Sequence, residues 1–295
     1  MCPARRACTS RCGQPARLTP RPRGVRAGQN KADAGPFAER ILVLLPHPDD
    51  EVVGVATFID DAVRQGCGVR VAFLTDGVPA IDVVWPWQRR HRAQRMALRG
   101  REAARAQQAL GYEVALAQHL PTRALRHHLG STLAALISVI ERDDIACVWA
   151  PAYEGGHQDH DAANYLANLL VARVPVWEFS EYHFAHRRVI CNQFIESQGT
   201  ERALALDATQ RARKQQLLQL YNSERGNLSY VTLAEEQMRP LCAYNYALPP
   251  HRGRTFYQRF QWVPRHPRID YTTPAEVSTS LTQFDAQHLC RSSSR

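Results

Sequence analysis

One histidine and two aspartates stand directly after the first strongly apolar segment of this 295-residue chain. The segment is residues 41–45, and the sequence His-Pro-Asp-Asp-Glu follows it at residues 47–51. At a strand-to-helix junction, His47 and Asp50 can point at a common atom, and imidazole plus carboxylate is a typical zinc ligand pair. Asp49 then lies beside the metal, where a free carboxylate can act as a general base. From these residues alone, a helix start with acidic side chains in its first turn is an equal alternative.

A second cluster of histidines and acids follows a later apolar segment, residues 145–150. Residues 154–161 read Glu-Gly-Gly-His-Gln-Asp-His-Asp. His160 can supply a third protein ligand, which leaves one metal position open for water. His157 is expected to face the same pocket, and Asp159 can orient a histidine as an outer partner. The competing interpretation is a surface cluster that caps a helix, but two clusters at two strand ends favour a metal site.

Strands and helices alternate along the chain in the pattern of a parallel sheet covered by helices, an α/β layered fold. We expect strands at residues 41–45, 69–74, 112–120, 145–150, 174–179 and 189–195. We expect helices at residues 52–65, 88–110, 129–142, 159–171 and 208–221. The remainder holds aromatics and prolines without clear periodicity. Because the carboxyl ends of parallel strands form the ligand-binding edge of such a sheet, both clusters are expected at that edge.

The net charge of +9 is concentrated at the start of the chain. Residues 1–40 hold nine of the 37 Lys and Arg and two of the 28 acids, so they carry +7 and the remaining 255 residues carry +2. This segment is rich in Pro, Gly and Arg without hydrophobic periodicity, which predicts a flexible basic leader. Residues 41–295 are expected to form a single domain, with a motif-bearing core over 41–180 and a C-terminal part over 181–295.

Composition excludes several classes of protein. A hydrophobic fraction of 44% and a charged fraction of 22% are ordinary for globular proteins, which excludes wholesale disorder. No apolar run approaches the ~20 residues of a membrane helix, and the leader lacks the apolar centre of a secretory signal. We therefore expect a cytoplasmic protein without a transmembrane segment, with an organellar transit peptide left open. The eight cysteines form no CxxC pair and are expected to be unpaired thiols.

These motifs together resemble those of the LmbE/PIG-L family of metal-dependent de-N-acetylases. The shared features are the His-Pro-Asp-Asp-Glu run, Thr-Asp-Gly at residues 75–77, His-x-Asp-His at residues 157–160, and a helix pattern Arg-x-x-Glu from Arg99 that ends in Leu-Gly. The resemblance covers roughly residues 41–180. It implies a Rossmann-like, mostly parallel sheet flanked by helices, and a zinc-bound water that hydrolyses an N-acetyl amide on a sugar. Iron can replace zinc in such sites.

The resemblance also implies a role for each residue of the two clusters. The metal would be held by His47, Asp50 and His160, with Asp49 as the base. His157 would stabilise the oxyanion or protonate the leaving amine, with Asp159 orienting it. Gln158 replaces the proline that the family usually has in the second motif, and only Gly54 remains of several glycines that often open the first helix. Neither position is a ligand, so these departures bear on subfamily and substrate.

Five residues near the two clusters are candidates for substrate contact. They are Asp76, Trp85, Trp87, Arg99 and Glu178. The tryptophan faces could stack on a sugar ring, and packing of their loop against the core is at least as good an interpretation. The expected partner is an amino-sugar-containing small molecule or glycoconjugate, and no specific nucleic acid.

Two other functions remain open from the sequence. One is hydrolysis of a different amide, such as a thiol-sugar conjugate. The other belongs to a different class, a nucleic-acid-binding protein that uses the basic leader, and it predicts an affinity that falls steeply with salt.

Overall fold

The computed structural model describes residues 35–292, apart from residues 186, 265 and 267, so most of the expected leader lies outside the described residues. The strands are β1 (Arg40–Leu45), β2 (Gly68–Phe73), β3 (Glu113–Ala117), β4 (Cys147–Pro151), β5 (Val176–Phe179), β6 (Tyr182–Ala185), β7 (Arg188–Cys191), β8 (Arg202–Ala205) and β9 (Glu235–Pro240). The α-helices are α1 (Asp50–Gly54), α2 (Ala56–Arg64), α3 (Pro86–Arg89), α4 (Arg92–Leu110), α5 (Leu129–Arg142), α6 (Gln158–Leu170), α7 (Ala208–Leu220) and α8 (Pro274–Ser292). Three short 3-10 helices are η1 (Leu125–His127), η2 (Asn222–Glu224) and η3 (Phe256–Gln258).

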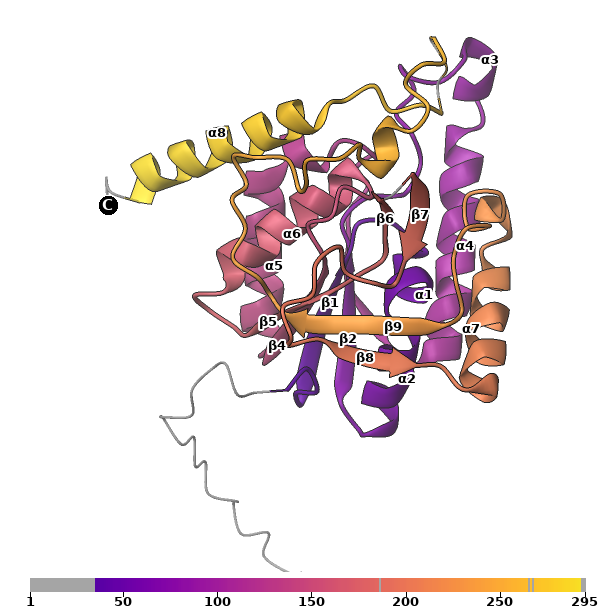
Figure 1. Ribbon diagram of the computed structural model, residues 1–295, viewed down its shortest axis with the longest axis vertical. Coiled ribbons are helices and arrows are strands. Elements are labelled where there is room, and N and C mark those ends of the chain that lie inside the picture. Colours follow the sequence, from indigo (N-terminus) through magenta and orange to yellow (C-terminus); the bar gives the residue numbers. More distant parts are fainter. Residues whose placement is uncertain (1–34, 186, 265, 267, 293–295) are drawn as a thin grey trace, which may run out of the picture.

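A seven-stranded sheet in the order β3-β2-β1-β4-β5-β9-β8 forms the centre of the molecule (Figure 1). Strands β1 to β5 are parallel, whereas β9 pairs antiparallel with both β5 and β8. After β1, the strands β2 and β3 are added in turn on one side of β1. The chain then crosses over, and β4 pairs with β1 on its other side. Ligands of open α/β sheets bind at such a reversal, outside the carboxyl ends of the strands. The segments that follow β1 and β4 therefore lie at the same edge of the sheet, where a ligand is expected.

Two hydrophobic layers bury the two faces of the sheet. From β1, Leu42 and Leu44 point to the layer that contains α5, α6 and α8, whereas Ile41, Val43 and Leu45 point to the layer that contains α2, α4 and α7. All five side chains are inaccessible to solvent. Burial on both faces explains why β1 is a continuous apolar run rather than an alternating one. The expected α/β fold, a mostly parallel sheet flanked by helices in a single domain, is confirmed.

Two of the expected helices are each divided into two. The helix expected over residues 52–65 is α1 followed by α2, with Val55 between them at φ −145°. The helix expected over residues 88–110 is α3 followed by α4. The other three expected helices match α5, α6 and α7 to within one residue at either end. The strand expected over residues 189–195 is shorter, and as β7 it pairs with β6 outside the central sheet.

The last third of the chain contributes elements that hydrophobic periodicity did not reveal. Strand β9 has the sequence Glu-Glu-Gln-Met-Arg-Pro, and its Glu236 and Arg239 are buried in ion pairs with Lys214 and Glu178. Hydrophobic periodicity identifies a strand by its buried apolar residues. A strand whose buried residues are paired charges does not show this pattern. Strand β8 and helix α8 were also not expected. No helix of the described residues is long and apolar enough to cross a membrane.

Candidate metal centre

The segments after β1 and β4 bring His47, Asp50 and His160 into one buried triangle. His47 Nδ1 lies 3.3 Å from His160 Nε2, and Asp50 Oδ2 lies 3.4 Å from each of these nitrogens. Tetrahedral ligands at ~2.1 Å from a zinc ion stand about 3.4 Å from one another. The three atoms therefore have the mutual spacing that such an ion requires, and all three residues are buried. Two imidazoles and one carboxylate fit a divalent metal ion in their chemistry as well.

The charges around the triangle favour a cation. Burial acts to lower the pKa of His47, but Asp50 and Asp159 outweigh it and raise this pKa to about 10. Burial acts to raise the pKa of Asp50, but the charges of His160 and His47 hold it well below its usual range. Both pKa shifts have the same cause, because ionised carboxylates stabilise positive charge in this buried pocket.

A second group, His47 with His157 and Asp159, also has metal-binding spacing. It uses the other nitrogen of the ring, His47 Nε2, which lies 3.1 Å from Asp159 Oδ2. That oxygen already accepts the backbone N–H of Arg123 at 2.6 Å and the hydroxyl of Thr122 at 3.2 Å. A carboxylate held in this way orients the histidine ring, as the outer partners of metal ligands do. The triangle is therefore the candidate metal site. The resemblance implied that Asp159 orients His157, but its Oδ2 lies 3.1 Å from His47 Nε2 and 3.6 Å from His157 Nδ1, so Asp159 is a candidate to orient His47 instead.

Asp49 stands next to the triangle in a strained backbone conformation. Its φ is 137°, a region that L-residues rarely adopt and that is often found at functional sites. Its backbone N–H donates to Glu51 Oε2 at 3.1 Å, which ties the turn to the first residues of α1. Burial raises the pKa of Asp49 to about 7, although the positive charge of Arg99 opposes this. A carboxyl group with a pKa near neutrality suits a general base.

Arg99 contacts protein groups rather than the open side of the centre. Its guanidinium lies 3.2 Å from Asp49 Oδ1 and 2.8 Å from Glu224 Oε1, and its side chain is buried. The sequence predicted Arg99 as a substrate contact. In the structure, the guanidinium of Arg99 is instead paired with two carboxylates of the protein, one of which is the candidate base Asp49. Arg99 therefore positions Asp49.

Glu51, the last residue of the first motif, has a supporting place that the sequence did not predict. Its carboxylate accepts hydrogen bonds from the hydroxyls of Tyr112 and Tyr221 as well as from the backbone N–H of Asp49. Glu51 is completely buried, and burial raises its pKa to about 7. Tyr221 follows α7, so the C-terminal part of the chain helps to hold the turn that carries Asp49.

His157 lies at the N-cap of α6 with its ring 4.5 Å from that of His47, edge to face. Its Nδ1 accepts the backbone N–H of Asp159 at 3.1 Å. Burial and the neighbouring charge of His47 hold the pKa of His157 well below its usual value, so the ring is neutral. With Nδ1 accepting, the proton of the neutral ring is on Nε2. His157 can therefore donate one hydrogen bond from Nε2.

Glu181 lies directly beside the centre, although it was not among the five residues predicted to contact substrate. Its Oε2 is 3.7 Å from His160 Nδ1, and neither of its oxygens accepts a hydrogen bond from the described residues. Burial, together with the negative charge of Asp50, raises its pKa well above the usual value. A Cβ on Gly54 would fall 2.6 Å from Glu181 Cγ, so this position in α1 requires glycine. As an isolated acid after a strand, Glu181 is by sequence alone more often a structural residue than a functional one.

An aromatic wall, defined here as Tyr182, Tyr230 and Phe256, extends from the metal centre. Tyr182 packs against His160 with ring centroids 5.3 Å apart. The three rings of the wall contact one another at centroid distances of 4.6–5.2 Å. Gly156 permits this approach, because a Cβ there would fall 2.4 Å from the Tyr182 carbonyl oxygen. These residues are far apart in sequence, so no local pattern connected them.

Of the other four predicted substrate contacts, two are buried and two are exposed. Asp76 is buried and pairs with Arg92 at 2.6 Å. Glu178 is fully buried, and its carboxylate accepts hydrogen bonds from Arg239, Tyr244 and Asn164. Protein groups therefore occupy Glu178, and we do not retain it as a substrate contact. Trp85 and Trp87 are exposed and stack on each other, with centroids 5.3 Å apart and ring planes 5° from parallel.

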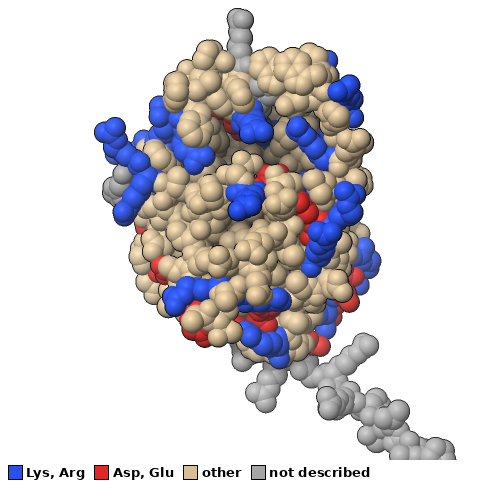
Figure 2. All heavy atoms as spheres, turned by 90° about the vertical axis from the view of Figure 1, so that its right-hand side faces the viewer, with Lys and Arg blue, Asp and Glu red and all other residues tan. Residues whose placement is uncertain are grey.

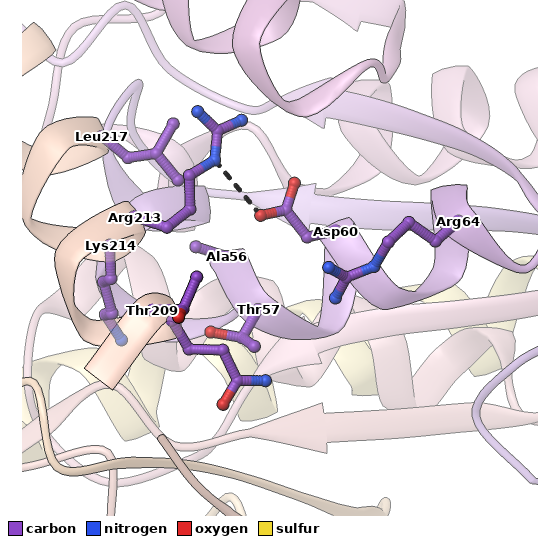
Figure 3. A pocket seen from close by; sticks show the side chains of 9 residues that line it. Ala56, Thr57, Asp60, Arg64, Thr209, Arg213, Lys214 and Leu217 are labelled. Atoms are coloured by element: carbon purple, nitrogen blue, oxygen red, sulfur yellow. Dashed lines mark hydrogen bonds and ion pairs between the residues drawn. The ribbon is translucent and has the colours of Figure 1, made fainter. Parts of the chain in front are cut away.

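A separate hollow of about 270 Å³ lies between α2 and α7 (Figure 3). Asp60 and Arg213 approach each other across it at 3.4 Å. Its lining includes Thr57, Arg64 and Lys214 but none of the metal-centre residues. Because its charged groups already pair within the protein, this hollow adds nothing to the chemistry of the centre.

The chain is similar to a known protein family in sequence and to solved deacetylases in structure. Residues 42–171 match the family model described as PIG-L, GlcNAc-PI de-N-acetylase. The solved structure of a deacetylase from the biosynthesis pathway of teicoplanin has a TM-score of 0.55 and 19% identity, over 70% of this chain and 99% of that chain. The zinc-inhibited form of teicoplanin deacetylase has a TM-score of 0.52 and 18% identity over the same shares. The A40926 pseudoaglycone deacetylase has a TM-score of 0.52 and 20% identity, again over the same shares.

These structural similarities show a shared fold. No significant match was found among curated protein sequences. The matched range includes most of β1, all of β4 and both motifs that form the candidate metal centre. Residues 42–171 of this chain are therefore a PIG-L (LmbE-like) domain.

Proposed function

We propose that the protein hydrolyses an N-acetyl amide on an amino-sugar-containing substrate, using a divalent metal ion held by His47, Asp50 and His160. The observation that carries this proposal is the buried ligand triangle, with an unliganded carboxylate at Asp49 and a neutral imidazole at His157 beside it. A metal site, a base and a hydrogen-bond donor are the three parts that amide hydrolysis needs. The match to the PIG-L family supports the N-acetyl amide as the bond that is cleaved.

The residues divide the work as follows. A divalent metal ion held by His47, Asp50 and His160 would lower the pKa of a bound water and polarise the amide carbonyl. Asp49, held in its strained turn next to Asp50, accepts the proton of the attacking water. His157 Nε2–H donates to the oxygen of the carbonyl as negative charge develops there. The leaving nitrogen then takes the proton that Asp49 has accepted, because the neutral ring of His157 has only its Nε2 proton, which stays in the hydrogen bond to the oxyanion.

We propose zinc as the metal, with iron as an alternative. The donor set of two nitrogens and one oxygen is that of known catalytic zinc sites. One of the structures with this fold is described as a zinc-inhibited form. Activity should therefore be measured at one equivalent of zinc and again in excess zinc, because excess zinc can inhibit an activity that one equivalent supports.

We propose an amino-sugar-containing small molecule or glycoconjugate as the substrate and the cytoplasm as the location. Two of the structures with the same fold are named as deacetylases, one of the teicoplanin biosynthesis pathway and one of the A40926 pseudoaglycone, and the second name supports a glycoconjugate. Trp85 and Trp87 stay candidates for stacking against it because they are exposed. The described cysteines Cys67, Cys147, Cys191 and Cys242 are unpaired, as proteins of a reducing compartment have them.

The test combines metal analysis with acetate release from a panel of N-acetylated sugars. We expect bound zinc or iron and release of one acetate per sugar. In the variant Asp49→Asn, acetate release should fall at least 100-fold while the metal content is unchanged, because the proton acceptor is lost and the ligands are intact. Asp82→Asn, an exposed aspartate outside the centre, is the matched control. Full activity of Asp49→Asn, or absence of both metal and acetate release, would contradict the proposal.

A further inference from the structure

A segment near the C-terminus reaches back to the second motif of the candidate metal centre. This strap, defined here as residues 268–272, lies between η3 and α8 (Figure 1). Its Asp270 is buried, and the carboxylate accepts a hydrogen bond from the side-chain amide of Gln158 at 2.6 Å. Gln158 is the first residue of α6 and stands between His157 and Asp159 in the sequence. The strap therefore contacts the motif at a residue whose two neighbours belong to the candidate metal centre.

Both polar atoms of the Gln158 side chain are hydrogen-bonded. Its amide nitrogen also donates to the hydroxyl of Thr272 at 3.1 Å, and its amide oxygen accepts a hydrogen bond from Arg126 Nε at 2.8 Å. The same Arg126 donates to Ser280 in α8 at 2.9 Å. Gln158 is buried, so water does not compete for these hydrogen bonds. The proline that the PIG-L family usually has at this position could form none of them, so the contact with the strap depends on the glutamine of this chain.

Arg123 provides a second connection between the strap and the motif. Its guanidinium donates to two successive carbonyl oxygens of the strap, those of Arg268 at 2.8 Å and Ile269 at 3.2 Å. Its Nε also lies 3.9 Å from the carboxylate of Asp270. The backbone N–H of Arg123 donates to Asp159 Oδ2 at 2.6 Å. Arg123 has a φ of 72°, a conformation that costs an L-residue energy and persists only where the surroundings hold it.

These contacts distinguish Arg123 from the surface arginines of the protein. On the face turned towards α4 and α7, many Lys and Arg side chains extend into solvent (Figure 2). Such charges seldom fix a neighbouring segment, because water competes for their hydrogen bonds. The side chain of Arg123 is only 20% exposed, and its planar fork of donors matches two fixed carbonyl oxygens. The guanidinium therefore determines where the strap lies relative to the turn that contains Arg123.

Both connections end at Asp159. Its two carboxylate oxygens accept backbone N–H groups, that of Arg123 and, at 3.1 Å, that of Leu125. The same carboxylate lies 3.1 Å from His47 Nε2, the ring nitrogen that does not belong to the metal triangle. Gln158 directly precedes Asp159, so its hydrogen bonds to the strap limit the movement of the start of α6. The strap thus restrains, through two routes, the acid that lies against a candidate metal ligand.

We infer that Asp270 is a positioning residue for the metal centre. Its contacts with Gln158 and Arg123 restrain Asp159. The carboxylate of Asp159 is thereby kept against His47, so that this imidazole is oriented before a divalent metal ion binds. The inference rests on the metal site of the proposed function and adds a segment outside the PIG-L domain. Loss of a direct outer partner of a metal ligand weakens metal binding by about 10- to 100-fold, and for Asp270, which acts through a further residue, we expect about 10-fold.

The zinc affinity of the metal-free protein tests the inference without using activity. The full chain competes with a chromophoric chelator for zinc at neutral pH, and the dissociation constant is obtained from the absorbance of the chelator. In Asp270→Ala the dissociation constant for zinc should rise about 10-fold. Asp270→Asn keeps an oxygen that can accept the Gln158 amide, so its dissociation constant should stay within about threefold of that of the unaltered protein.

Tyr271→Phe is the matched control within the strap. The hydroxyl of Tyr271 donates to the Val263 carbonyl oxygen and accepts the backbone N–H of His266, so its loss loosens the segment without removing a contact to the motif. The dissociation constant for zinc should change by less than about twofold in this variant, because neither of these hydrogen bonds involves Gln158 or Arg123.

Gln158→Pro tests the same connection from the side of the motif and serves if Asp270→Ala fails to fold. His157 is extended, at φ −146° and ψ 147°, which is a conformation that a following proline favours. Proline is also favoured as the first residue of a helix, so α6 should form. Zinc binding should weaken about 10-fold, and the addition of Asp270→Ala to this variant should weaken it by less than about a further twofold.

The outcomes separate this inference from the proposed function. Unchanged zinc affinity in both Asp270→Ala and Gln158→Pro, or losses that multiply in the double variant, would overturn the positioning role of Asp270. An equal loss in Tyr271→Phe would also overturn it, because the loss would then come from a general loosening of the segment. If zinc affinity changes as expected but the unaltered protein releases no acetate from N-acetylated sugars, the inference is upheld and the proposed function is contradicted. Absence of zinc binding by the unaltered protein would overturn both.

Discussion

Arg99 Nη2 lies 3.2 Å from Asp49 Oδ1 and also donates to the Pro48 carbonyl oxygen at 2.5 Å. One side chain from α4 therefore holds both the carboxylate of the proposed base and the backbone just before it. Glu224 completes the arrangement at 2.8 Å from the same guanidinium. The carboxylate of Asp49 is thus fixed by an arginine that is itself held by a second acid.

The first prediction concerns this contact. Replacement of Arg99 by Met should lower kcat by about 100-fold through misplacement of the base. It should also lower the free energy of unfolding by about 3 kcal/mol, because two acids lose their buried partner. Metal content, measured by elemental analysis, should stay at the level of the unaltered protein. The exposed Arg101 provides the control Arg101→Met, and unchanged kcat in Arg99→Met would contradict the positioning role.

The second prediction concerns removal of the metal. A ligand that binds only the folded state at 100 times its dissociation constant stabilises it by about 2.7 kcal/mol, so a chelator should lower the melting temperature by about 5–10 °C. His160→Ala removes a member of the triangle and should show no such response to the chelator. His128→Ala, which alters an exposed histidine, should respond as the unaltered protein does. A chelator response that persists in His160→Ala would place the metal elsewhere.

The third prediction concerns the pH dependence of stability. His183 is buried, and burial lowers its pKa from 6.5 to about 4. Between these values the unfolded chain binds a proton at His183 that the folded protein does not, so this contribution to stability is present above pH 6.5 and is lost as the pH falls towards 4. The loss amounts to at most about 3 kcal/mol. Urea unfolding at pH 7.5 and pH 5.0 should show a smaller loss in His183→Gln than in the unaltered protein or in His128→Gln.

The fourth prediction concerns a buried ion pair that connects the C-terminal part to α1. Lys214 Nζ donates to Glu236 and to the Val53 carbonyl oxygen, each at 2.9 Å. Lys214→Met leaves Glu236 without its cation and should lower the free energy of unfolding by about 3–5 kcal/mol, measured by urea unfolding. Arg211→Met, one turn away on an exposed position of α7, should change it by less than about 0.5 kcal/mol. A loss that is no larger for Lys214→Met than for Arg211→Met would show that the pair is not needed.

The parallel half of the sheet and the placement of both motifs could be predicted from the sequence. Strands β1, β2 and β4 are short apolar runs bounded by Pro or Gly, and both clusters directly follow a strand. Parallel topology then requires the two clusters to meet at one edge, so His47 and His160 could be paired from sequence spacing alone. These features are local, and the chain encodes them within a few residues.

The support of the centre was decided only by the tertiary structure. Arg99 and Glu224, Glu51 and Tyr221, and the aromatic wall join residues that lie tens to more than a hundred positions apart, and no periodicity connects them. The antiparallel strand β9 was hidden for the same reason, because its buried Glu236 and Arg239 become compatible with the core only through distant partners. The sequence by itself determined which residues could bind a metal and where the strands would bring them. The fold decided which side chain holds the carboxylate of Asp49 and which acid lies against His47, because burial changes the energy of each charge according to its neighbours in space.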